Sequence, residues 1–281
     1  MPDLPLELAR QIFELTAVRY PLDSICSVLP VSRLVFDWTV PIAFETVEVT
    51  PRNQAAIAVC VRSTKVPSFA HTKHLIAWSY TGPSLAEIGI IASAFARIEA
   101  FTGAPHLLAM LQPYTNYLAR PTHICLGDGI TSRFHLSGRM DNAVRTASHI
   151  VLQDSDPAKV LNFAKAISGK RNLIVLLSGV EGHDAARLAL NLLELEQVEW
   201  LRVCLGPPTE GDASQGKIED SRKQLEDGLS QLKEDQLRRV RVEVTAFDLT
   251  SSQNLSKFLR PYRYVWLHDP YSPLISEVRS L

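Results

Sequence analysis

The spacing of apolar residues predicts helices over residues 1–44. Leu8, Ile12 and Leu15 recur at three- or four-residue intervals, which is typical of an amphipathic helix. A second short helix can begin at Asp23 and end before Pro30, because aspartate caps helices and proline interrupts them. A third can begin at Ser32. We therefore expect a unit of three helices over 1–44.

A different pattern begins at residue 45, where short leucine-rich and β-branched runs alternate with amphipathic helical stretches. The runs that we expect to form strands are 46–49, 75–78, 98–101, 124–126, 150–152, 173–177, 201–205, 240–244 and 265–267. Seven of the eight steps between run starts measure 23 to 29 residues, the period of leucine-rich repeats. This period predicts an α/β solenoid over 45–281, with parallel strands and outer helices.

One step is longer, at 39 residues, and contains a proline- and glycine-rich loop followed by a charged stretch. An apolar stripe runs through that stretch, carried by Ile218, Leu225, Leu229 and Leu232. We interpret residues 206–239 as a solvated amphipathic helical insertion in the array.

Composition restricts the classes of partner. The chain is 46% hydrophobic, which supports a sizeable core, and its formal net charge is −1, so it has no global field to attract nucleic acid or an anionic membrane. The longest uncharged, mostly apolar run, 88–96, is far shorter than a membrane span. The N-terminus lacks the pattern of a signal peptide, and the four cysteines form no C-x-x-C pair. We expect a soluble nuclear or cytoplasmic protein with free thiols and no cofactor.

The N-terminal segment carries a motif. Leu4-Pro5-Leu6-Glu7-Leu8 is followed by Ile12-Phe13-Glu14-Leu15, and then by 29–38, which reads Leu-Pro-Val-Ser-Arg-Leu-Val-Phe-Asp-Trp. Residues 2–49 resemble the F-box and its continuation into a first strand in fungal, mostly basidiomycete, F-box proteins with degenerate leucine-rich repeats. The resemblance is moderately specific there and loose afterwards.

This resemblance implies that the protein is a non-catalytic substrate receptor of an SCF-type cullin ubiquitin ligase. Its partners would be the Skp adaptor with the cullin scaffold, and an unidentified target protein. The resemblance assigns adaptor contacts to Leu4, Pro5, Leu8, Ile12, Val31, Ser32 and Val35. It leaves Leu15, Leu29 and Trp38 to pack inside the helical unit.

The target would bind the face of the strands whose side chains alternate with the core leucines. The candidates on that face are Trp78, Phe101, Ile174, Arg202 and Trp266. Cys125 and Val151 also fall on it, where a face open to water would carry polar residues. Either this face is apolar and meets a partner, or both faces of the sheet are buried.

Two other interpretations remain open. The N-terminal unit could be a helical cap on a repeat scaffold that does not dock the adaptor. Alternatively, residues that follow strand ends could form the acidic rim of an α/β-barrel enzyme, namely Asp128, Asp154, Asp248 and Asp269 together with His268. We expect no enzyme, because no phosphate-binding loop or nucleophile elbow is present and aspartate is common in turns.

Histidines give no strong metal signal. His71 and His74 have an H-x-x-H spacing but no further ligands beside them. His74, His123 and His149 each precede a strand core, so we interpret them as one recurring repeat position and expect no metal site.

Overall fold

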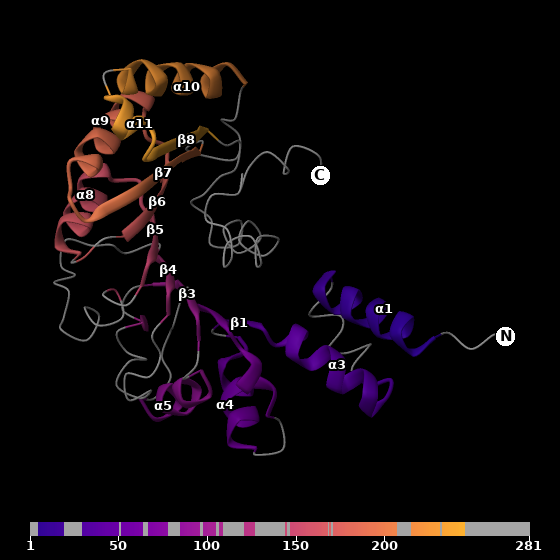
Figure 1. Ribbon diagram of the computed structural model, residues 1–281. Coiled ribbons are helices and arrows are strands. Elements are labelled where there is room, and N and C mark those ends of the chain that lie inside the picture. Colours follow the sequence, from indigo (N-terminus) through magenta and orange to yellow (C-terminus); the bar gives the residue numbers. More distant parts are fainter. Residues whose placement is uncertain are drawn as a thin grey trace. The chain divides into compact units, whose positions relative to one another are not determined.

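The structure, a computed structural model, describes the greater part of the chain up to residue 244 (Figure 1). The described residues are 5–19, 30–50, 52–63, 67–77, 85–95, 98–104, 107–108, 121–126, 144, 147–167, 169, 171–206, 215–230 and 232–244. Contacts divide the chain into two compact units. Unit 1 comprises Met1–Glu99 with Met110–Ala119, and unit 2 comprises Ala100–Ala109 with Arg120–Leu281. The division falls inside the predicted array.

Unit 1 begins with two helices that pack against each other, α1 (Leu6–Arg19) and α3 (Arg33–Ala43). Ser32 caps α3, because its Oγ accepts a hydrogen bond of 3.1 Å from the Val35 N–H. Within α3, the buried Thr39 Oγ1 donates to the carbonyl oxygen of Val35 at 2.7 Å, which satisfies its hydroxyl in the apolar interior. The predicted middle helix lies outside the described residues.

The first repeats complete unit 1. Strand β1 (Thr46–Val49) pairs in parallel with β2 (His74–Ala77), and between them lie α4 (Gln54–Arg62) and the 3-10 helix η1 (Pro67–His71). Helix α5 (Leu85–Ala94) follows. The ring of Phe69 lies edge-on to Phe44 at 5.7 Å and edge-on to Phe95 at 5.6 Å between ring centroids. This aromatic cluster therefore joins the end of the N-terminal helices to the first repeats.

Unit 2 contains a parallel sheet in which the strands follow chain order. Its strands are β3 (Ala100–Gly103), β4 (His123–Leu126), β5 (His149–Gln153), β6 (Arg171–Ser178), β7 (Val198–Gly206) and β8 (Val240–Val244). Each strand is paired in parallel with the next. The helices of this unit are α8 (Pro157–Ala166), α9 (Gly182–Leu193), α10 (Gln215–Leu229) and α11 (Glu234–Leu237).

Helices α8 and α9 lie on the same side of the strands and pack side by side (Figure 1). A parallel pairing of consecutive strands with crossover helices on one side is the arrangement of an α/β solenoid. The predicted solenoid-like α/β class is thus confirmed, while a three-helix F-box unit is not.

Eight of the nine predicted strands coincide with β1–β8, within about three residues at most ends. Strand β3 starts two residues later than predicted, at Ala100, because the buried Ile98 precedes the strand and the Glu99 N–H donates to the Lys73 carbonyl at 2.7 Å. The ninth run, 265–267, lies outside the described residues.

The amphipathic helix predicted within 206–239 is present as α10, whose charged face is exposed, but it belongs to the array and is not an addition to it. Helices α10 and α11 are themselves the crossover between β7 and β8, and α10 packs along α9. Leu225 and Leu229 of the predicted stripe are buried. Gly228 makes this contact close, since a methyl group at its Cα would overlap that of Ala186. The step is long because the crossover holds two helices.

Candidate partner-binding surface

Exposed apolar side chains concentrate at the N-terminal end of the chain. In the part of the chain that the structure describes, eight large hydrophobic residues are exposed, and seven of them lie between residues 6 and 36. They are Leu6, Leu8, Ile12, Leu15, Val31, Leu34 and Phe36, and we call them the N-terminal apolar surface. The eighth is Val59 on α4. Four of the seven lie on α1 and three lie at or just before the start of α3, and a concentration of exposed apolar groups commonly marks an interaction site.

Helix geometry explains why α1 contributes to this surface. Leu8, Ile12 and Leu15 are spaced by four and then three residues, so they lie on the same face of the helix. The described residue that α1 buries fully is Ala17, a small side chain that permits close packing. The packing of α1 against α3 therefore leaves the large residues of this stripe in solvent.

Charged side chains accompany the stripe. The Arg10 Nε donates to Glu14 Oε1 at 2.7 Å across one helical turn, and both groups are partly exposed. Glu7 and Asp37 are also exposed. An apolar centre with polar neighbours is the composition of a typical protein interface.

Most of the predicted adaptor contacts that the structure describes are exposed. Pro5, Leu8, Ile12, Val31 and Ser32 are accessible, and Leu4 lies outside the described residues. The Ser32 hydroxyl is used as the cap of α3.

Two predicted roles are corrected. Val35 is only 5% exposed, because it shares the buried face of α3 with Thr39 and Ala43, so it packs inside the helical unit. Leu15, which was expected inside, is 67% exposed. Trp38 is half-buried, and Leu29 lies outside the described residues.

The strand face predicted to bind a target is buried on β3 to β7 at the positions named for it that the structure describes. Phe101, Ile174 and Arg202 are buried, as are Cys125 and Val151. Strands β3 and β4 are buried at every successive residue, the pattern of a sheet covered on both faces. The expectation of an open face is therefore wrong for these residues. Trp78 and Trp266 lie outside the described residues.

Thiol reactivity provides a test of this burial. Burial raises the pKa of the Cys125 thiol, while Cys60 on α4 is exposed. In a Cys26→Ser background, we expect one thiol per folded chain, Cys60, to react readily with a thiol reagent at neutral pH. Cys125 and Cys204 should react only after unfolding. Modification of Cys125 as fast as Cys60, read by peptide mass spectrometry, would contradict its burial.

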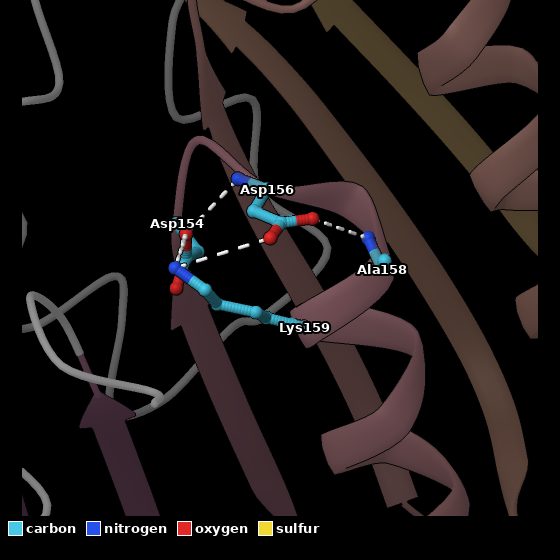
Figure 2. A network of polar contacts seen from close by, with 4 residues as sticks. All are labelled: Asp154, Asp156, Ala158 and Lys159. Carbon is cyan, nitrogen blue, oxygen red and sulfur yellow. Dashed lines mark hydrogen bonds and ion pairs between the residues drawn. The ribbon is translucent and has the colours of Figure 1, made fainter. Parts of the chain in front are cut away.

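Asp154 is the one member of the predicted acidic rim that the structure describes, and it is part of a turn (Figure 2). Its Oδ1 accepts from the Asp156 N–H at 2.9 Å, and Asp156 Oδ1 accepts from the Ala158 N–H at 2.9 Å, which caps α8. The Lys159 Nζ lies 3.9 Å from both carboxylates. These contacts hold the chain between β5 and α8, the ordinary use of aspartate in a turn and cap.

His74, His123 and His149, which were predicted to occupy one repeat position, each begin a strand. His123 and His149 are cross-strand partners at the starts of β4 and β5, and Asn172 of β6 follows in the same row. His74 starts β2, opposite Thr46. The described residues include no group of three or more His, Cys, Asp or Glu side chains arranged to hold a metal ion.

Comparisons with known proteins were made for the whole chain. No family model and no curated protein matches the sequence. Among solved structures, the chain is similar to a leucine-rich repeat-containing protein, LegL7, from Legionella pneumophila, at 12% identity and a TM-score of 0.39. The alignment covers 79% of this chain and 93% of that one.

Within the described ranges, none of the helices is both long and apolar enough to cross a membrane.

Proposed function

We propose that this protein is a substrate-receptor subunit of an SCF-type cullin ubiquitin ligase and that it docks the Skp adaptor through the N-terminal apolar surface. The observation that carries the proposal is the concentration of exposed apolar residues on α1 and at the start of α3. These are the elements that carry the F-box-like motif. A small helical unit that leaves its large aliphatic residues in solvent is suited to a partner that covers them.

The repeats would serve as a rigid support with no chemistry of their own. In such a complex, the receptor holds a target near a charged conjugating enzyme, which raises the effective concentration of the target's lysines. The parallel strands of unit 2, with a buried apolar core, provide a stable body for that purpose. Because the strand face is buried, the target would bind elsewhere, on the helices or the strand-end loops.

Removal of two aliphatic side chains tests the adaptor contact. Leu8→Ala together with Ile12→Ala deletes apolar area from a single face of α1. Each buried aliphatic residue contributes roughly 1.5 kcal/mol or more, so we expect the Kd for a purified Skp-type adaptor to rise about a hundredfold. Isothermal titration calorimetry measures this change, and circular dichroism verifies that the variant is folded.

Val59→Ala is the matched control, because Val59 is 63% exposed but lies on α4, outside the N-terminal apolar surface. Its adaptor affinity should equal that of the wild type. If the Leu8→Ala/Ile12→Ala variant bound the adaptor with the same Kd as the wild type, docking through this face of α1 would be excluded. Absence of binding by the wild-type protein would leave the interpretation as a repeat scaffold with a helical cap.

A further inference from the structure

Two histidines are stacked at the amino-terminal ends of β4 and β5 in unit 2. The rings of His123 on β4 and His149 on β5 lie with centroids 4.4 Å apart and an interplanar angle of 6°. The two residues are direct partners in the strand register, so the backbone pairing fixes their separation. Two imidazoles at this distance stack well while neutral, but two imidazolium cations would repel each other.

A chain of hydrogen bonds surrounds the ring of His149. The Asn172 Nδ2, which can only donate, lies 3.1 Å from His149 Nε2. With the amide in this orientation Nε2 accepts, and a neutral ring that accepts there carries its hydrogen on Nδ1. The His149 Nδ1 lies 2.8 Å from Ser148 Oγ, which in turn donates to the Thr122 carbonyl at 3.2 Å. Every step of this chain is satisfied by a neutral imidazole.

We propose that His123, His149 and Asn172 form a proton-sensitive joint that holds the amino-terminal ends of β4, β5 and β6 together and opens as the pH falls below the ordinary titration range of histidine. A proton added to His149 converts Nε2 into a donor, so the Asn172 amide must turn its Oδ1 toward the ring to keep this contact. A second proton, on His123, places two imidazolium cations in a stack whose spacing the strand register fixes. Their repulsion favours separation of the strand starts.

Among the described residues, the side chains that face His149 from the neighbouring strands carry no negative charge. From β4, the titratable group that faces His149 is His123, and from β6 the facing side chain is Asn172. Along the same strands, Arg171 precedes Asn172 and is itself a cation, and the β7 residue in register with Asn172 is the uncharged Trp200.

The direction of the pH effect follows from burial. Desolvation lowers the pKa of His149 below its ordinary value of 6.5. The unfolded chain therefore binds a proton at a higher pH than the folded chain does. The stabilisation is complete above the ordinary pKa and is lost as the pH falls from there through the lowered folded value.

The experiment compares the wild type with His149→Gln, a side chain that keeps hydrogen-bonding groups but does not titrate. Between about pH 7.5 and about pH 5.5, we expect the Tm of the wild type to fall about 3 °C further than that of the variant. Hydrogen exchange should give a local readout at the Ser148 and Asn172 amides, which donate to the Thr122 and Ser148 carbonyls. Their protection should fall severalfold more in the wild type at the lower pH.

His183→Gln is the control, because His183 is an exposed histidine of α9 that lies 3.3 Å from Glu181 and 3.5 Å from Asp184. This variant should keep the acid-induced loss of the wild type. An NMR titration of His149 with a midpoint at or above 6.5 would overturn the proposal, and this measurement needs only the wild-type protein. An unchanged pH dependence of Tm in His149→Gln would overturn it as well.

Discussion

Replacement of Leu152 by alanine is expected to lower the free energy of unfolding by about 4 kcal/mol. Leu152 on β5 is fully buried and lies in register between Leu126 of β4 and Val175 of β6, which are fully buried as well. Its partners are held in place by strand pairing on both sides, so they can collapse only slightly into the space left by the deletion. The cost therefore includes a cavity in addition to the lost transfer free energy. Denaturant unfolding of the whole chain measures it.

Leu15→Ala is the matched control for this deletion, since it removes the same atoms from a residue that is 67% exposed. It should change the free energy of unfolding by less than about 0.5 kcal/mol. If Leu152→Ala were no more destabilising than Leu15→Ala, the packing of β5 between β4 and β6 would have to be different.

The positions of the strands were predictable because a buried parallel strand appears in the sequence as a short, uniformly apolar run between turns. A run such as 173–177 is uniformly apolar and is followed by a turn at Gly179, whose φ of 68° suits glycine. The structure extends this run to β6, 171–178. The repeat period then places consecutive strands side by side, since a crossover of this length returns the chain to the neighbouring position.

What covers the second face of the sheet was not predictable in the same way. Cys125, Val151 and Ile174 are apolar where an open face would be polar, and this pattern fits a partner surface as well as it fits self-coverage. Burial depends on segments distant in sequence, and periodicity contains no information about which segment covers a strand. The buried thiol and the buried Arg202 thus required the structure.

Part of the candidate surface was predictable, because three- and four-residue spacing shows which residues share one face of a helix. Leu8 and Ile12 lie four residues apart, and Leu15 continues the same stripe, so its exposure follows from the spacing that gives theirs. Val35 lies on the buried face of α3, four residues before Thr39 and eight before Ala43, which lie on the same face. The motif assigned both Leu15 and Val35 by similarity, whereas helical spacing groups Leu15 with Leu8 and Ile12, and Val35 with Thr39 and Ala43.

Gly182→Ala is expected to destabilise unit 2 by about 3 kcal/mol, through the contact between α9 and α10. Gly182 is the first residue of α9 and is buried. A methyl group there would overlap the backbone carbonyl oxygen of Ser221 and come within 2.8 Å of the Gln224 Cβ. A backbone atom inside a helix has no alternative rotamer, so α10 as a whole must move away from α9. Denaturant unfolding should show the loss.

A second glycine, Gly228 of α10, also lies in the contact between α9 and α10. Substitutions there distinguish a steric clash between the two helices from the general effect of glycine and alanine on helix stability. A methyl group at Gly228 would overlap the Cβ of Ala186, which is a side-chain atom, so Ala186→Gly should remove the obstruction. We expect Gly228→Ala to be destabilising alone. The Gly228→Ala/Ala186→Gly pair should return to within about 1 kcal/mol of the wild type, because the helix-propensity terms of the two exchanges cancel. No side-chain deletion on α10 should rescue Gly182→Ala in this way, since its obstruction is backbone. Additive losses in the Gly228–Ala186 pair would contradict the close packing of α9 on α10.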